Sequence, residues 1–328
     1  MKEITICCVT YNQAQWISQA INSFLNQKTS IEYEIMIYNH ASTDNTESII
    51  NEYLKDYPNK IRYIRSNTNV FNQMGIQFMA QKVFPLITSK YVAFCDGDDY
   101  WIDPLKLQKQ YDFLENNNDY GACYGQVKRY DERTRSFGKL QGAEVNSFEE
   151  LLEECTITWQ TFFLRNELLQ AYIAEIRPDI QHPDWSVQDY PLELYVARKF
   201  KLFFFKEPMA VFRTYSNSVT HQKSIDKINK YAIGILSIIS FYTKDCTEET
   251  KTRILARYTS NFMGILIRNK QHRNIRNNLK LFYKAGKRYY IDALCLSVAS
   301  CFLWFPLGVR ALFYLKNKLF PIKSRTYQ

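Results

Sequence analysis

The first hundred residues alternate short apolar runs with longer amphipathic stretches, and this alternation restricts the fold more than any other feature. Apolar runs rich in β-branched and aromatic residues predict strands, while apolar residues at helical spacing predict helices. Strands separated by helices imply right-handed crossovers and a mainly parallel sheet, so we expect an α/β protein. The expected strands are Glu3–Val9, Glu34–Tyr38, Ile61–Arg65 and Tyr91–Cys95, and the expected helices are Ala14–Asn26, Asn45–Lys55 and a stretch near Met74–Phe84.

The fourth expected strand leads directly into an aspartate cluster. Residues 91–104 read YVAFCDGDDYWIDP, which places Asp96, Asp98 and Asp99 within four positions. Carboxylates this close repel one another and resist burial unless a cation holds them together. Mg²⁺ or Mn²⁺ takes one or two carboxylates and fills its shell with phosphate oxygens and water, which favours a nucleotide diphosphate as the second ligand. A polar turn that leads into a helix is the alternative, and the cluster alone does not decide between them.

Polar residues also follow the first two expected strands. Thr10, Tyr11 and Asn12 come after the first strand, and Asn39 and His40 come after the second. Ligands of open α/β sheets bind outside the carboxyl ends of the strands. We therefore expect these residues and the aspartates to converge on one crevice.

Composition restricts the setting of the chain. With 328 residues and 46% hydrophobic content, the sequence suffices for one large domain or two modest ones. Its eight cysteines are scattered without CxxC spacing, which favours reduced thiols over disulfides or a zinc site. The amino-terminal residues enter a strand directly and do not show a basic, then apolar, leader, so we expect a cytoplasmic protein.

The charge is distributed unevenly along the sequence. Residues 1–222 hold 22 Lys and Arg against 28 Asp and Glu, a net charge of −6, whereas residues 223–328 hold 20 against 5, a net charge of +15. A basic block of this kind binds nucleic acid or anionic lipid. It contains an uncharged run, Ala293–Val309, that is interrupted by Pro306 and Gly308 and is shorter than the roughly 20 residues of a membrane span. We expect a membrane-interface segment within 291–315 and no nucleic acid, with a buried helix as the alternative.

Four motifs occur in a fixed order along the chain. They are VTYNQ at 9–13, ASTDNT at 41–46, CDGDDYW at 95–101, and VQDYPLELYVAR at 187–198 followed by MAVFRTYSNSVTH at 209–221. Together they resemble family-2 glycosyltransferases with a GT-A fold, especially bacterial enzymes of capsule and surface polysaccharide assembly. The resemblance covers residues 3–221. It implies a GT-A domain over 1–222, with a donor half at about 1–118 and an acceptor half at about 119–222, followed by a basic helical region at 223–328.

The resemblance also implies roles for residues of the donor half. Tyr11 would stack on the nucleobase beside Thr10, and Asp98 would reach the ribose or sugar and share a divalent cation, Mn²⁺ or Mg²⁺, with Asp99. Asp96 lies just outside the matched motif. Where the family has two aspartates after the second strand, this chain has Asn39 and His40, and a neutral histidine accepts a hydrogen bond through one ring nitrogen. A UDP-sugar is the expected donor, with the choice of base left open by this departure.

In the acceptor half the resemblance places the general base on Asp189, which accepts the proton of the attacking sugar hydroxyl. Asp189 also lies at an expected helix start, where aspartate is an ordinary N-cap. Arg213 is expected to meet the diphosphate, and His221 is a further candidate for phosphate or metal. The remaining candidates for sugar contacts are Trp159, Gln160 and Trp185, although aromatic residues of this kind also serve in ordinary packing.

These expectations combine into an inverting, metal-dependent glycosyltransferase. It would transfer a sugar from a nucleotide-diphosphate donor to a lipid-linked glycan acceptor at the inner face of the plasma membrane. A non-catalytic protein that binds a sugar nucleotide or a partner enzyme is the alternative suggested by Asn39 and His40. A sugar nucleotidyltransferase would need a glycine-rich phosphate loop after the first strand, and VTYNQ contains no glycine.

Overall fold

The computed structural model describes residues 2–69, 77–177, 185–215, 225–251, 253–254 and 257–258. Two compact units divide the chain, Met1–Gln222 and Lys223–Gln328, and the sheet belongs to the first. Of the expected features, His221 and the segment 291–315 lie outside the described residues. No helix in the described part of the chain combines the length and the apolar character that crossing a bilayer requires.

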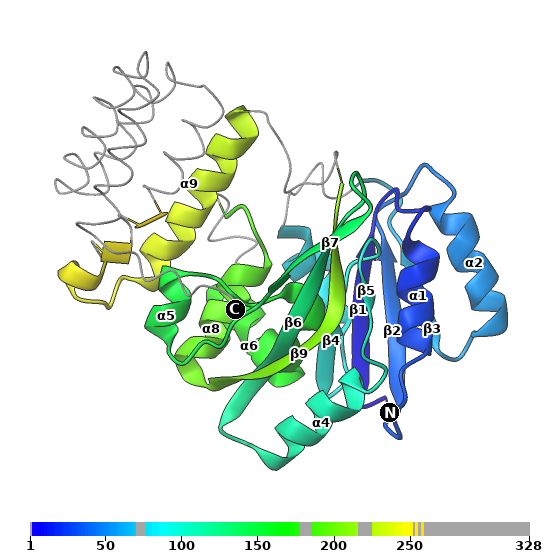
Figure 1. The fold of residues 1–328 in the computed structure, drawn as a ribbon, viewed down its shortest axis with the longest axis horizontal. Coiled ribbons are helices and arrows are strands. Elements are labelled where there is room, and N and C mark those ends of the chain that lie inside the picture. Colours follow the sequence, from blue (N-terminus) through cyan, green and yellow to red (C-terminus); the bar gives the residue numbers. More distant parts are fainter. Residues whose placement is uncertain are drawn as a thin grey trace. The chain divides into compact units, whose positions relative to one another are not determined.

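Within the described residues of the first unit, nine strands form one sheet in the order β3-β2-β1-β4-β8-β6-β9-β5, with β7 paired to β6 (Figure 1). The strands β1 to β4 pair in parallel, as expected. The other half is mixed, because β8 runs antiparallel to both of its neighbours while β6 and β9 are parallel. The strands are β1 Ile4–Thr10, β2 Tyr33–Asn39, β3 Ile61–Arg65, β4 Tyr91–Phe94, β5 Tyr100–Trp101, β6 Tyr120–Asp131, β7 Ser136–Gln141, β8 Phe163–Arg165 and β9 Lys201–Thr214.

Helices cover the sheet in two groups, with α1 and α2 beside β1 to β3 and α5, α6 and α8 beside β6 and β9 (Figure 1). Of the helical stretch expected near Met74–Phe84, the structure describes residues 77–84, which include a π-helical turn and the start of a 3-10 turn that contains Pro85. The helices and turns are α1 Ile17–Leu25, α2 Thr46–Asp56, η2 Met79–Val83, η3 Phe84–Leu86, α4 Lys106–Asn116, α5 Phe148–Glu153, η4 Trp159–Thr161, α6 Asn166–Ile176, α8 Asp189–Lys199 and, in the second unit, α9 Ile225–Tyr242.

The core explains why the carboxyl ends of the parallel strands are rigid. The apolar side chains of α1, among them Ile17, Ile21 and Phe24, pack in one cluster with Ile4 and Ile6 of β1. Strand β1 has a parallel neighbour on each side and is buried along nearly its whole length, as is usual for parallel sheets covered by helices. The carboxyl end of β1 is therefore held in place beside β2 and β4.

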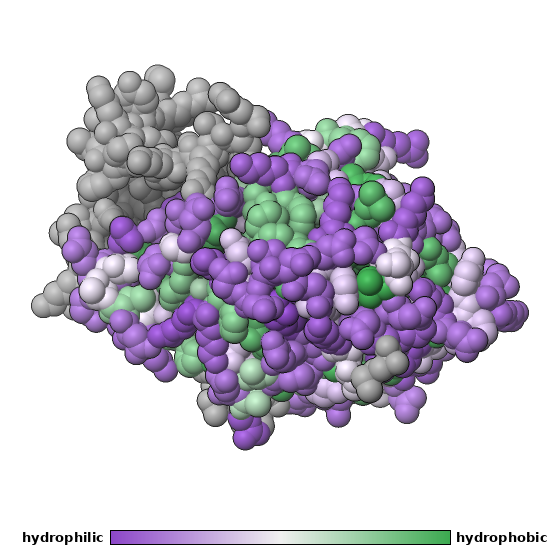
Figure 2. Space-filling model, turned by 90° about the horizontal axis from the view of Figure 1, so that it is seen from below, coloured by the Kyte–Doolittle hydropathy of each residue, from purple (hydrophilic) through white to green (hydrophobic). Residues whose placement is uncertain are grey.

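The opposite edge of the molecule differs in character. Figure 2 shows the face seen from below in Figure 1, the side on which β1 begins, and hydrophilic residues dominate it with small separate hydrophobic patches between them. Scattered surface hydrophobic residues are normal for a globular protein and need no binding partner. The polar groups with unusual environments lie instead at the carboxyl ends of the strands.

Candidate functional site

The aspartate loop sits directly against the start of α1. After β4, the backbone N–H of Gly97 donates to the carbonyl of Val9 at 3.0 Å, which continues the parallel pairing beyond the strand. A Cβ atom at position 97 would lie 2.6 Å from Oε1 of Gln13 and 2.9 Å from Oγ1 of Thr10. Any other residue at this position would displace the side chains of Gln13 and Thr10, so the close approach favours glycine.

Residues from the second half of the unit hold both Asp98 and Asp99. Asp99 is 3% exposed, and its two carboxylate oxygens accept hydrogen bonds from Nε2 of Gln160 and the backbone N–H of Arg213, each at 2.7 Å. Asp98 accepts a hydrogen bond from the Tyr215 hydroxyl at 2.9 Å, and its backbone carbonyl accepts one from Nε of Arg213 at 2.7 Å. The motif is therefore oriented by η4 and the end of β9.

Burial and mutual repulsion make this cluster unfavourable for negative charge. Burial, together with the charges of Asp98 and Asp189, raises the pKa of Asp96 to about 8. Burial and the charge of Asp98 raise the pKa of Asp99 well above its ordinary value, and burial also raises the pKa of Asp98. A cation at this point would relieve the repulsion and favour the ionised forms.

The side chains of this loop bear on whether a divalent cation can bind here. Among the described residues, no three His, Cys, Asp or Glu side chains are grouped so that they could hold a metal by themselves. Mg²⁺ and Mn²⁺ sites that bind nucleotides need only one or two carboxylates, with phosphate and water as the other ligands. The half-buried Asp98 and the buried Asp99 are adjacent and repel each other, so their carboxylates fit such a site.

The Arg213 side chain is buried and hydrogen-bonded to other residues of the protein. Its guanidinium donates to Oε1 of Glu132 and, at 2.6 Å, to Oε1 of Gln19, and the residue is 6% exposed. The Trp16 indole donates to the same Glu132 oxygen at 3.2 Å, so α1 and β6 are tied together at this point. Contact between Arg213 and a diphosphate stays a prediction, since its donors serve the protein in this structure.

The expected nucleobase side combines an exposed residue, Tyr11, with two buried ones, Thr10 and Asn39. Tyr11 is 41% exposed, as a stacking platform requires, and the neighbouring Thr10 is buried with its hydroxyl bonded to Gln13 Oε1 at 2.7 Å. Asn39 is fully buried, where its amide donates to the Tyr63 hydroxyl at 2.9 Å and accepts from the backbone and hydroxyl of Ser42. Asn39 thus shapes the loop after β2.

His40 differs from Asn39 because its ring is buried without hydrogen bonds. The residue is 3% exposed, and its ring lies edge-to-face against Phe78 with centroids 4.0 Å apart. Burial lowers the pKa of His40 to about 4, so the ring is neutral at physiological pH. Neither ring nitrogen has a partner among the described residues, and both are buried, so contact between His40 and a nucleobase stays a prediction.

Asp189 is the first residue of α8, as the sequence predicts. It is half-buried, its Oδ1 accepts a hydrogen bond from the backbone N–H of Tyr190 at 2.8 Å, and burial raises its pKa. One turn further along the helix, Glu193 is 1% exposed and accepts a hydrogen bond from the Cys155 thiol at 3.2 Å. Burial and the charge of Asp189 raise the pKa of Glu193 well above its ordinary value. A carboxylate with a raised pKa near the cluster is suited to accept a proton.

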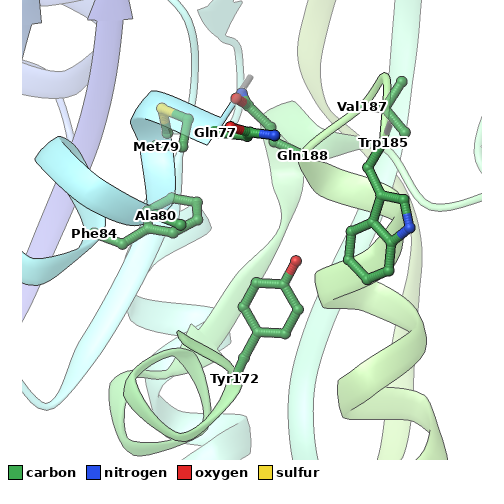
Figure 3. Close-up of a pocket in the computed structure, with 8 residues that line it drawn as sticks. All are labelled: Gln77, Met79, Ala80, Phe84, Tyr172, Trp185, Val187 and Gln188. Atoms are coloured by element: carbon green, nitrogen blue, oxygen red, sulfur yellow. The ribbon is translucent and has the colours of Figure 1, made fainter. Parts of the chain in front are cut away.

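A cavity of about 20 Å³ adjoins the residues that precede Asp189. Trp185 lines it, and Figure 3 shows the Tyr172 hydroxyl directed toward the space between the labelled side chains. Trp159 occupies a different environment, because its ring stacks on Phe94 with centroids 4.0 Å apart and is 8% exposed. The other lining residues are Gln77, Met79, Ala80, Phe84, Val187 and Gln188.

Several residues of the site were missed by the sequence analysis. Tyr215, Glu132 and Gln19 contribute hydrogen bonds to Asp98 or Arg213, although no local pattern marks them. Gln160 was expected to face a sugar, and its amide instead binds Asp99 in this structure. The weak signal available was the position of Tyr215 two residues after Arg213 at the end of a strand.

Comparison with known proteins identifies the class. Residues 5–173 match the model of the family "Glycosyl transferase family 2", and the chain belongs to this family. The mannosyltransferase PcManGT of Pyrobaculum calidifontis, solved with GDP-Man and Mn²⁺, has a TM-score of 0.54 and 14% identity over 98% of this chain and 89% of that one. The expected GT-A-like α/β fold is therefore confirmed.

Two proteins are similar to the chain in sequence. The uncharacterized protein Rv1520 of Mycobacterium tuberculosis is 28% identical over 228 residues, which span 68% of this chain and 62% of that protein. The dTDP-rhamnosyl transferase RfbG of Shigella flexneri is 23% identical over 269 residues, which span 78% of this chain and 87% of that protein. The chain thus spans less than two thirds of the mycobacterial relative.

Proposed function

We propose that the protein is an inverting glycosyltransferase that uses a nucleotide-diphosphate sugar. The observation that carries this proposal is the adjacent carboxylate pair Asp98 and Asp99 after β4, in which Gln160 and the backbone of Arg213 orient Asp99. Asp189, at the start of α8, supplies a further carboxylate, and its charge contributes to the raised pKa of Asp96. Asp98 and Asp99 would serve the donor, while Asp189 would serve the acceptor. Membership of the family and the names of its relatives support the same activity.

The proposed reaction is a single displacement. The acceptor hydroxyl gives its proton to Asp189 as its oxygen forms a bond to the anomeric carbon of the donor. The bond from that carbon to the phosphate oxygen breaks on the opposite face, and the nucleoside diphosphate leaves with the bonding electrons. Since attack and departure occur on opposite faces, the configuration at the anomeric carbon is inverted.

Asp98 and Asp99 would hold a divalent cation, Mn²⁺ or Mg²⁺, beside the diphosphate. When bound, the cation neutralises charge on the departing phosphate. Gln160 and the backbone of Arg213 keep the Asp99 carboxylate in one orientation before any ligand arrives. This preorganisation reduces the cost of assembling the site.

The donor is proposed to be a UDP-sugar or a nucleotide with a similar pyrimidine base. Tyr11 offers an exposed ring for stacking, and the neutral ring of His40 offers an acceptor for the base N–H in place of a carboxylate. Asn39 is left out of this contact because its amide is used by Tyr63 and Ser42.

The acceptor is proposed to be a lipid-linked glycan of a surface polysaccharide. The strongly basic sequence of residues 223–328 favours an anionic membrane surface, which would place the enzyme at the inner face of the plasma membrane. Trp185, four residues before Asp189, would contact the acceptor. The names of relatives that act in rhamnosyl and teichuronic acid assembly support a polysaccharide product.

The test is release of nucleotide and transfer of sugar from a panel of donors, with Mn²⁺, Mg²⁺ or a chelator. We expect Asp99→Asn to abolish release. Asp189→Asn should slow transfer by about 10²- to 10⁴-fold, the usual contribution of a general base, and leave donor binding intact. Asp112→Asn, which changes an exposed carboxylate on α4, is the matched control and should retain full activity.

A non-catalytic sugar-nucleotide-binding protein is the second candidate, and one observation favours it. The Tyr215 hydroxyl occupies an oxygen of Asp98, where a ligand group is expected. Tight donor binding without turnover, unaffected by Asp189→Asn, would establish this alternative.

A further inference from the structure

The hairpin formed by β6 and β7 carries an unusual surface. Residues 133–140 are all exposed, and Phe137 and Leu140 are 56% and 38% exposed. In the described part of the chain, β7 pairs only with β6, so its other edge is open. Exposed apolar side chains on an open edge strand promote aggregation unless the edge is protected or used.

Cations surround these apolar side chains. Residues 128–141, which we call the β6–β7 hairpin, contain three Arg and two Lys against one Asp and one Glu. Both acids are engaged, since Asp131 pairs with Arg133 at 3.2 Å and Glu132 binds Arg213. The rest of residues 1–222 is acidic overall, so this hairpin is a local exception to the charge of its own unit.

We propose that the β6–β7 hairpin is a contact site for an anionic lipid surface. Phe137 and Leu140 would enter the headgroup layer, while Arg133, Arg135 and Lys139 would lie among the lipid phosphates. Apolar groups interspersed with cations suit this interface better than a second protein edge, because like charges on two copies of the hairpin would repel.

The hairpin is joined directly to the candidate site. Asp131 of β6 is paired with Thr214 of β9. The residue before Thr214 is Arg213, whose backbone N–H donates a hydrogen bond to Asp99. In Figure 1 the hairpin reaches the same edge of the sheet as the carboxyl end of β1. A membrane contact here would hold the site near the leaflet whatever reaction it performs, so this inference does not depend on the proposed function.

The first experiment uses tryptophan as a probe in the full chain. Phe137→Trp is compared with Tyr57→Trp, which replaces a tyrosine of similar exposure, 42%, at the end of α2. Vesicles are of phosphatidylglycerol or of phosphatidylcholine, with and without brominated chains. With phosphatidylglycerol, we expect the added emission of Phe137→Trp to shift to the blue and to be quenched by bromine, and that of Tyr57→Trp to stay unchanged.

A second variant tests the cations. Replacing Arg133, Arg135 and Lys139 with Gln should weaken binding to phosphatidylglycerol vesicles by about 100-fold, at about 1 kcal/mol for each surface charge. Thermal unfolding and nucleotide release should remain at the wild-type level, since all three side chains are exposed.

Two results would overturn the inference. The first is unchanged Phe137→Trp emission, whether or not the protein binds the vesicles, because the hairpin would then lie away from the lipid. The second is a lipid-free dimer that Phe137→Ser dissociates, which would assign the open edge to a second copy of the chain.

Discussion

At the scale of single residues, the site depends on side chains that orient the aspartates rather than on the aspartates alone. Both oxygens of Asp99 are occupied by donors from η4 and β9, and its burial leaves little room for alternative orientations. A buried carboxylate oxygen that loses its donor costs roughly 1–3 kcal/mol, more than a surface contact. Gln160 is therefore a positioning residue with an effect that can be measured.

We predict that Gln160→Leu weakens the apparent affinity for Mn²⁺ and lowers turnover by about 10- to 100-fold. The substitution keeps similar volume but removes the amide that fixes Asp99. Steady-state kinetics at varied Mn²⁺ should show both changes, while Gln108→Leu, a half-buried glutamine on α4, should show neither. Unaltered metal dependence in Gln160→Leu would mean that Asp99 is held by other contacts.

The sequence predicts where the aspartates and Asp189 lie in the fold but not the residues that contact them. Asp98, Asp99 and Asp189 stand where local pattern and resemblance placed them, at a strand end and a helix start. Gln160 and Tyr215 reach the motif across 61 and 117 positions of the chain. Pairings over such distances depend on tertiary structure, which no local periodicity encodes.

At the scale of elements, the parallel half of the sheet was predictable because each strand and helix carries its own apolar period. Strand β3 has the expected bounds, β4 ends one residue earlier than expected, and β1 and β2 differ by one residue at each end. The apolar segment Thr158–Leu164 forms a 3-10 turn at Trp159–Thr161 followed by the short β8. Buried apolar segments of this length are compatible with either structure until their neighbours are known.

Helix α4 contains a buried cation that sequence pattern did not reveal. Lys106 is fully buried, with Nζ 2.7 Å from Gln110 Oε1 and 4.0 Å from the centre of the Trp101 ring. Burial lowers the pKa of Lys106 to about 7. Between this value and the ordinary one near 10.5, the unfolded chain binds more protons, so the free energy of unfolding increases as pH rises.

We predict that Lys106→Met raises the free energy of unfolding by about 2 kcal/mol at pH 7, because an apolar side chain of similar length avoids the desolvation cost. The difference in free energy of unfolding between the variant and the wild type should shrink as pH rises from about 7 to 10.5. In this range Lys106 is neutral in the folded wild-type protein, and the cost of deprotonating it on folding falls as pH rises. Urea denaturation at several pH values measures this. A gain that stays constant with pH would show that Lys106 is not neutralised on folding.

At the scale of the whole molecule, the charge separation between the two units bears on where the protein acts. Residues 1–222 carry a net charge of −6 and residues 223–328 a net charge of +15, so most of the attraction to an anionic surface resides outside the sheet. The β6–β7 hairpin would add a second contact, and two linked contacts bind more tightly than either alone. The candidate site, by comparison, is built entirely from residues of the first unit.

We therefore predict that a chain ending at Gln222 retains metal-dependent nucleotide release to within about twofold but binds phosphatidylglycerol vesicles at least about 10-fold more weakly, with a shallower salt dependence. The core and the aspartate contacts lie within this part of the chain, so its thermal unfolding should remain cooperative. Nucleotide release and vesicle sedimentation, measured on the same preparation at several salt concentrations, separate the two properties. Loss of nucleotide release from a cooperatively folded 1–222 chain would instead mean that the second unit contributes to the reaction itself. The basic charge of that unit would then have to be explained by the substrate rather than by the membrane.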